Sequence, residues 1–149
     1  ILFPQAEQIV VPGLREMDFG TFEGRNYIEM ENDPDYRAWV DSNCESACPD
    51  GERKDDFCRR SCAVFAKLVD DAFAAGREQL VILAHGGTQM SVMERFALPR
   101  KEYHEWLGPN AGGYILEADP AVWAKDHTLQ CLTQVQYTRD ARRAGEAGC

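Results

Sequence analysis

The sequence has 149 residues, of which 44% are hydrophobic and 28% are charged, and this composition is typical of one globular domain with a full hydrophobic core. Lysine and arginine total 16 against 25 acidic residues, which gives a formal net charge of −9. This acidic balance, without a basic stripe, excludes the usual nucleic-acid-binding protein, whose affinity depends on clustered cations. No apolar run is long enough to cross a bilayer, and residues 1–5 lack the features of a signal peptide. We therefore expect a cytoplasmic protein with no nucleic-acid or membrane partner.

The first half of the chain predicts a short strand, an irregular stretch and a long helix. Residues 9–11 predict a strand, which Pro12 and Gly13 end. Residues 14–24 predict an irregular loop, residues 27–31 and the segment from Pro34 predict short helical turns, and residues 43–52 predict a loop. A three-four spacing of side chains then predicts a long helix that stops near Gly76, with Phe57, Ser61, Val64, Phe65, Leu68, Val69, Ala72 and Phe73 on one face.

The segment from residue 80 to residue 98 is the most informative part of the sequence. Residues 80–84 are an unbroken apolar run that predicts a buried strand, and residues 88–98 have the spacing of a helix that ends at Pro99. His85 is then at the carboxyl end of a strand and just before a helix, where α/β sheets bind ligands. The free N–H groups of such a helix attract anions, phosphate above all, and Gly86 and Gly87 let a ligand approach the backbone.

The rest of the chain predicts a short helix over residues 101–107 and strands over residues 113–117 and 129–137. Residues 141–149 are expected to be a frayed tail. The order of these elements implies an α/β layered domain with some antiparallel pairing, and residues 1–149 show no interdomain linker.

The sequence has six cysteines, a high number for this length. A domain of this size forms a core without disulfides, so we favour reduced thiols that fill small apolar spaces. Two pairs at a spacing of four residues, Cys44 with Cys48 and Cys58 with Cys62, also allow a zinc-stabilised structural domain, and a disulfide between the pairs stays open.

Four segments resemble, in the same order, motifs of the histidine phosphatase superfamily, which includes the phosphoglycerate mutases and α-ribazole phosphatases. Residues 14–24 resemble its L-x-E-x-x-F-G-x-x-E-G segment, and residues 49–52 followed by Arg60 resemble its P-x-G-E … R segment. Residues 83–87 are similar to its second histidine motif, and residues 110–117 to the strand that follows. The resemblance covers nearly the whole chain except the tail. It implies a three-layer α/β/α sandwich with a mostly parallel mixed sheet.

One motif of the family does not occur in this sequence. The family's nucleophile is the histidine of an R-H-G motif at the end of its first strand, whereas the histidines here are His85, His104 and His127, none of them in R-H-G. Residues 1–149 thus resemble the C-terminal two-thirds of the family's domain. We expect an upstream segment to supply the nucleophile and a central strand, and we expect residues 1–149 alone to be inactive and unstable.

The resemblance implies a role for several residues. His85 matches the second histidine, which donates hydrogen bonds or positive charge to phosphoryl oxygens. Glu16 matches the proton donor for the leaving alkoxide, so Glu16→Gln is expected to slow phosphorylation most. The expected substrate-binding residues lie around these two: Gly86, Gly87, Glu23, Glu52, Asn110 and Arg15. For Glu23, Glu52 and Asn110 loop capping and turn formation are equal alternatives, and Arg15 is also a candidate ion-pair partner.

The function expected from this resemblance is hydrolysis of a small phosphorylated metabolite through a phosphohistidine intermediate. No metal and no cofactor are expected, because histidine, arginine and helix N–H groups stabilise the charge in this family. Three alternatives stay open: a phosphoglycerate mutase, a non-catalytic phosphatase-like binding module, and the zinc-stabilised domain. The sequence does not predict the substrate or the oligomeric state.

Overall fold

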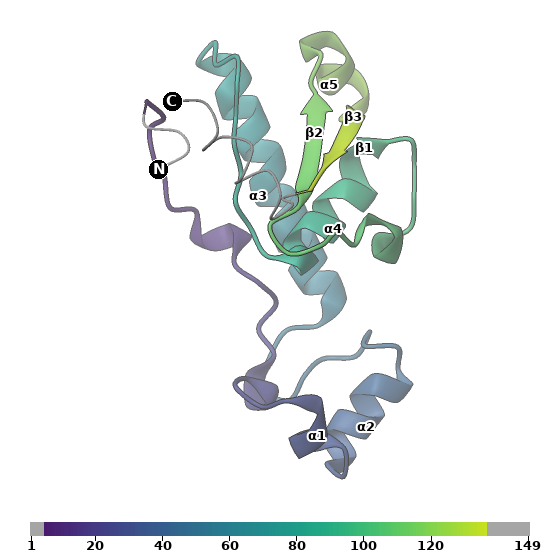
Figure 1. The fold of residues 1–149 in the computed structure, drawn as a ribbon. Coiled ribbons are helices and arrows are strands. Elements are labelled where there is room, and N and C mark those ends of the chain that lie inside the picture. Colours follow the sequence, from purple (N-terminus) through teal and green to yellow (C-terminus); the bar gives the residue numbers. More distant parts are fainter. Residues whose placement is uncertain (1–4, 137–149) are drawn as a thin grey trace, which may run out of the picture.

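The computed structural model describes residues 5–136, and the expected tail at residues 141–149 lies outside this range. In the described residues, α-helices precede a small three-stranded sheet and one further α-helix lies between its last two strands, which confirms the α/β class (Figure 1). The elements are α1 (Tyr27–Met30), α2 (Pro34–Asp41), α3 (Lys54–Ala74), α4 (Gly86–Phe96), β1 (Ala97–Leu98), β2 (Gly113–Glu117), α5 (Pro120–Asp126) and β3 (Leu129–Val135), with single 3-10 turns η1 (Pro12–Leu14), η2 (Gly20–Phe22) and η3 (Tyr103–Trp106).

The sheet has three strands in the order β1-β3-β2. β1 is parallel to β3, with Ala97 opposite Leu129, whereas β2 is antiparallel to β3 over its whole length. The sheet is therefore mixed, as expected, but its longer pairing is antiparallel. The expectation of a mostly parallel sheet does not hold for the described residues.

Two expected strands, residues 9–11 and 80–84, do not pair with any strand among residues 5–136. Val10 is 90% exposed and Leu83 is 92% exposed, so neither segment is buried as a sheet strand would be. The prediction of paired strands here is wrong for the described residues. The physical reason is that a strand needs a neighbour to satisfy its N–H and C=O groups, and apolar sequence alone does not supply one.

The long helix α3 organises the main core. Asp55 and Asp56 lie in its first turn, where carboxylates favour the helix dipole, and its buried face contacts η1 and α4. The core also contains Trp123 of α5, whose Nε1 donates to Asp70 Oδ1 at 2.7 Å. The buried members of this core come from five elements: Leu14, Phe65, Val69, Val92, Phe96, Trp123 and Leu129. α3 thus fixes where η1 and α4 meet.

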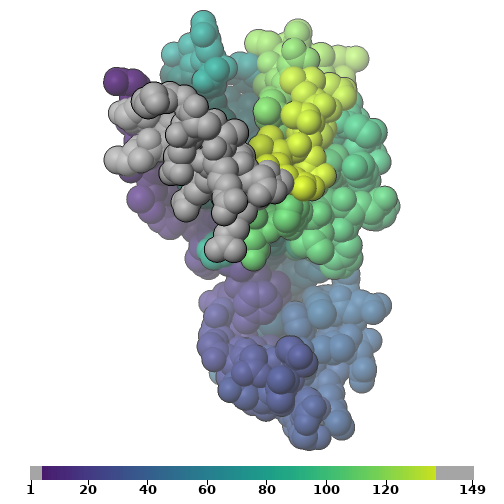
Figure 2. Space-filling view, in the orientation of Figure 1, coloured from purple at the N-terminus to yellow at the C-terminus, as the bar shows by residue number. Residues whose placement is uncertain are grey.

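Residues 20–50 form a small lobe that contains α1 and α2, drawn in blue in the lower part of Figures 1 and 2. Its own core is anchored on the first turns of α3 through Phe57, which is 1% exposed. Gly20 closes the lobe: its φ is +55°, and a Cβ there would overlap the backbone of Pro49. The expected helical turns at 27–31 and from Pro34 are confirmed as α1 and α2.

Candidate active site

The carboxylate of Glu16 lies at the N-terminus of α4. Its Oε2 accepts a hydrogen bond from the Gly87 N–H at 3.2 Å, and its Oε1 accepts one from the Met17 N–H at 2.9 Å. A Cβ at position 87 would overlap Glu16 Oε1, so only glycine permits this approach. Glu16 and Gly87 are 71 positions apart in the sequence, and their contact brings residues 14–24 and residues 83–87 together at the end of one helix.

His85 is the residue that precedes the first turn of α4. Its backbone is extended, with φ −71° and ψ 162°, its carbonyl accepts from the Gln89 N–H at 3.0 Å, and its side chain is exposed. A Cβ added at Gly86 would meet no described atom within 4 Å, so the space beside this turn is open. A solute can therefore approach the His85 ring and the first turn of α4 from solvent.

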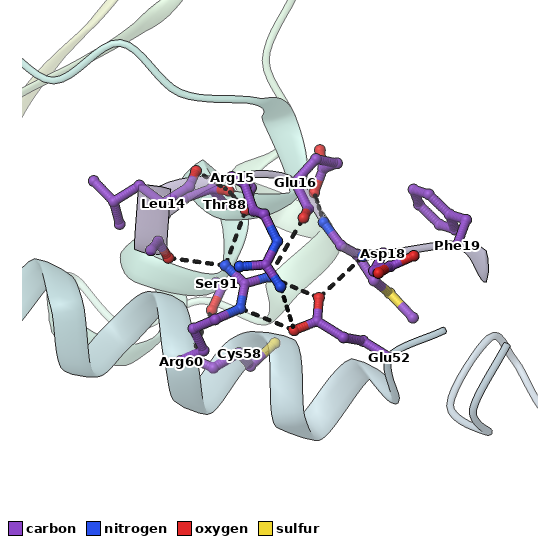
Figure 3. A network of polar contacts seen from close by, with 12 residues as sticks. Leu14, Arg15, Glu16, Asp18, Phe19, Glu52, Cys58, Arg60, Thr88 and Ser91 are labelled. Atoms are coloured by element: carbon purple, nitrogen blue, oxygen red, sulfur yellow. Dashed lines mark hydrogen bonds and ion pairs between the residues drawn. The ribbon is translucent and has the colours of Figure 1, made fainter. Parts of the chain in front are cut away.

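Arg60 of α3 holds the segment that carries Glu16, as Figure 3 shows. Its Nη1 donates to the Gly13 carbonyl at 2.8 Å and to the Arg15 carbonyl at 3.2 Å, and its Nη2 donates to the Glu16 carbonyl at 3.3 Å. The same guanidinium makes a two-point ion pair with Glu52, from Nε at 2.9 Å and from Nη2 at 2.7 Å. One side chain therefore fixes the backbone on both sides of the candidate proton donor.

Glu52 completes this network rather than pointing to an open site. Its Oε2 also accepts from the Asp18 N–H at 3.0 Å, and its side chain is only 19% exposed. Arg60 holds the pKa of the Glu52 carboxyl below its usual range, against an opposing effect of burial. Through its bonds to Arg60 and to the Asp18 N–H, Glu52 helps to hold residues 15–18 in place.

Three other expected substrate-binding residues lie at different places. Arg15 is about half exposed, and its Nη2 is 3.8 Å from Glu52 Oε1. Glu23 accepts from the Phe19 N–H at 2.9 Å and so closes the η2 turn. Asn110 is exposed in the turn before β2, and among residues 5–136 no hydrogen bond joins its side chain to the α4 N-terminus. Of the expected site residues, the structure brings together Glu16, His85, Gly86 and Gly87.

Two residues at the α4 N-terminus went unnoticed in the sequence. The Tyr103 hydroxyl donates to the Gly87 carbonyl at 3.3 Å, and burial raises the pKa of Tyr103, with smaller contributions from Cys58 and the Glu16 carboxylate. Thr88, which is 1% exposed, donates through Oγ1 to the Leu14 carbonyl at 3.2 Å. No motif marked them, because both contacts depend on tertiary approach.

The described cysteines Cys44, Cys48, Cys58, Cys62 and Cys131 are free thiols. Burial raises the pKa of Cys48 to about 11 and also raises that of Cys44, Cys58 and Cys62. Within residues 5–136, no group of three or more histidine, cysteine or acidic side chains is arranged to hold a metal ion. The described residues therefore lend no support to a zinc-stabilised domain.

The α4 N-terminus has the parts of an oxyanion site. Its first N–H groups have no partner one turn earlier in the helix and carry partial positive charge, so they bind anions. The exposed His85 ring adds a hydrogen-bond donor beside them, and the Glu16 carboxyl adds a group that gives or takes a proton. This combination suits transfer of a phosphoryl group.

The comparison with protein families agrees with this geometry. The model of the histidine phosphatase superfamily, branch 1, matches residues 3–129, and the chain therefore belongs to this superfamily. Searches of curated proteins and of solved structures returned no match. Members of the superfamily are generally phosphatases or mutases, which is the activity that this membership suggests. Among the helices of residues 5–136, none combines the length and the apolar character that a membrane span requires.

Proposed function

We propose that the protein is a phosphomonoester hydrolase that works through a phosphohistidine intermediate. In this proposal, residues 1–149 supply the proton donor and the groups that bind the phosphoryl oxygens. The observation that carries this proposal is the Glu16 carboxylate on the Gly87 N–H, beside the exposed His85. The substrate is a small phosphorylated metabolite, and the reaction needs no metal. A cytoplasmic location is part of the proposal, since free thiols are the usual state of cysteine in a reducing compartment.

Two displacements at phosphorus make up the proposed reaction. A histidine outside residues 1–149 attacks phosphorus, the bond from phosphorus to the ester oxygen breaks, and Glu16 gives its proton to the leaving alkoxide. Water then attacks the phosphohistidine, the phosphorus–nitrogen bond breaks, and the Glu16 carboxylate accepts the proton of that water. His85 and the first N–H groups of α4 donate to the equatorial oxygens in both steps, except for the Gly87 N–H, which Glu16 occupies. A phosphate dianion beside Glu16 favours the protonated carboxyl, because like charges repel.

The surface beside this site offers two unpaired backbone edges to the strand that would carry the nucleophile. A cavity of about 200 Å³ separates residues 82–84 from β2, with Ile82, Leu83, Tyr114 and Leu116 in its lining. Residues 80–84 are extended and unpaired among residues 5–136, and β2 pairs on one side alone. Unsatisfied backbone groups on both walls favour an added strand between them. A strand there would end close to His85, because residues 82–84 lead directly into it.

A phosphatase assay on two forms of the protein tests the proposal. One form is residues 1–149, and the other carries in addition the residues encoded upstream of Ile1. We expect the longer form alone to hydrolyse phosphomonoesters and to give an alkali-stable, acid-labile phosphoenzyme. Equal activity of both forms would place the chemistry elsewhere. An upstream segment without a histidine, in an inactive protein that still binds phosphate, would show a non-catalytic binding module instead.

A further inference from the structure

A second hollow of the surface lies between α3 and the C-terminal half of α4. Its volume is about 440 Å³. Three arginines from separate segments line it: Arg59 from α3, Arg95 from α4, and Arg100 from the segment after β1. The thiols of Cys58 and Cys62, the hydroxyl of Ser91 and the carboxylate of Glu94 come from the other lining residues. The hollow therefore concentrates positive charge on a chain whose net charge is −9.

The carboxylate in this lining is that of Glu94, and a backbone N–H holds one of its oxygens. Its Oε1 accepts a hydrogen bond from the Tyr103 N–H at 2.9 Å. Arg59 is ion-paired with Asp56 at 2.7 Å, on a solvent-exposed part of α3. The remaining two cations, Arg95 and Arg100, have no carboxylate oxygen within 4.0 Å among the residues from 5 to 136.

Five of the thirteen lysines and arginines in residues 5–136 have no carboxylate oxygen within 4.0 Å. Most lysines and arginines between residues 5 and 136 have a carboxylate within 4.0 Å, and the exceptions are Arg37, Arg53, Arg95, Arg100 and Lys101. Two of these exceptions line the same hollow. Acidic residues are in excess in this chain, yet Arg95 and Arg100 have no carboxylate partner in the hollow. Two positive charges placed together in this way favour the binding of an anion from solution.

Arg100 also has a structural role, but it leaves donors free. Its Nη1 donates to the carbonyls of Glu94 and Arg95, which closes the last turn of α4. A guanidinium has five N–H donors, and no hydrogen bond to residues 5–136 occupies Nε or Nη2 of Arg100, which lines the hollow. Arg95 makes no side-chain hydrogen bond to residues 5–136, and its guanidinium carbon lies 6.0 Å from the Phe96 ring centroid.

We infer that this hollow is a second oxyanion site, for the phosphate groups of a small molecule. Arg95 and Arg100 are its ligands, because the planar guanidinium fork matches two oxygens of one phosphate. The volume leaves room for more than one phosphate group. The site is separate from the candidate active site, since eight residues of α4, about 12 Å of helix, separate Arg95 from Gly87. This inference does not depend on the proposed catalytic function.

Binding of inorganic pyrophosphate to the longer form of the protein, which carries the upstream residues in addition to residues 1–149, tests the inference when it is followed by amide NMR. We expect shifts at residues 58–62, 91–95 and 100, and about tenfold weaker binding there for each of Arg95→Ala and Arg100→Ala. Arg53→Ala is the matched control, because it removes an exposed arginine that also lacks a carboxylate partner but lies outside the hollow. It is expected to leave the affinity unchanged, and so is Glu16→Gln, which alters the candidate active site.

Two outcomes would overturn the second site. In the first, the shifts are confined to residues 85–88, and pyrophosphate then binds at the candidate active site alone. In the second, Arg53→Ala weakens binding as much as Arg95→Ala, and the attraction is then unspecific charge. Spectra of each variant without pyrophosphate show whether the variant is folded, and Arg95→Lys, which keeps the charge but not the fork, is expected to weaken binding less than alanine does.

Discussion

Replacing Gly87 by alanine tests the contact on which the site is built. The new methyl group and Glu16 Oε1 cannot occupy the same space, so the carboxylate must leave the Gly87 N–H. A hydrogen bond to a charged group contributes about 1.5–3 kcal/mol, and alanine in a helix gains back up to about 1 kcal/mol over glycine. We therefore expect Gly87→Ala to lower the free energy of unfolding of the longer form of the protein by about 1–2 kcal/mol, measured with urea.

Gly86→Ala is the matched control, because a methyl group there meets no described atom within 4 Å. Its effect is expected to be neutral or stabilising by up to about 1 kcal/mol. In a Glu16→Ala background the penalty of Gly87→Ala is expected to vanish, since the clashing group is gone. If the two glycine variants behave alike, or if the penalty persists without Glu16, the carboxylate does not lie on this helix.

The remaining predictions concern the network around the site. Arg60→Ala removes the Glu52 ion pair and three hydrogen bonds to carbonyls, so we expect it to lower the free energy of unfolding by about 2–3 kcal/mol. For the control Arg59→Ala, which removes an exposed ion pair, we expect a loss of about 0.5 kcal/mol or less. Similar losses for the two variants would contradict the role of Arg60 in the network. Because the pKa of Glu52 is lowered in the folded protein, its contribution is present above about pH 4.3 and disappears as the pH falls through the lowered value. Unfolding measured from pH 6 to pH 3 should show this loss in the unchanged protein and not in Glu52→Gln. The raised pKa of Tyr103 predicts that it is the last described tyrosine to ionise in an ultraviolet titration, with stability falling as the pH rises past about 10. Tyr103→Phe should remove that last step, and an unchanged titration would contradict the assignment.

The parts of the site that follow from local sequence were predictable. The resemblance to the histidine phosphatase superfamily implied that Glu16, His85 and the glycine pair serve one site, and the structure places Glu16 on the Gly87 N–H. The apolar spacing in the long helix predicted α3, although the helix begins at Lys54, three residues before Phe57. Such periodicity reports directly on the face that a helix buries.

The parts that depend on a distant neighbour were not predictable. Residues 80–84 have the composition of a buried strand, yet pairing is a property of two segments, and no described strand pairs with them. The central role of Arg60 rests on carbonyls more than forty residues away, which no local pattern encodes. α5 was not predicted, although the sequence contains a signal for it. Asp119 is the N-cap of this helix and Pro120 is its first residue, and both are typical of a helix start.

The measurement that tests the central claim most directly is the rate of phosphoenzyme formation in the longer form of the protein, with two substrates of different leaving group. An alkyl phosphate needs a proton on its leaving oxygen, whereas p-nitrophenyl phosphate releases a weakly basic phenolate that does not. We predict that Glu16→Gln slows the alkyl ester by about 10²–10⁴-fold and the nitrophenyl ester far less. Equal slowing of both substrates, or no slowing of either, would contradict the assignment of Glu16 as the acid at the N-terminus of α4.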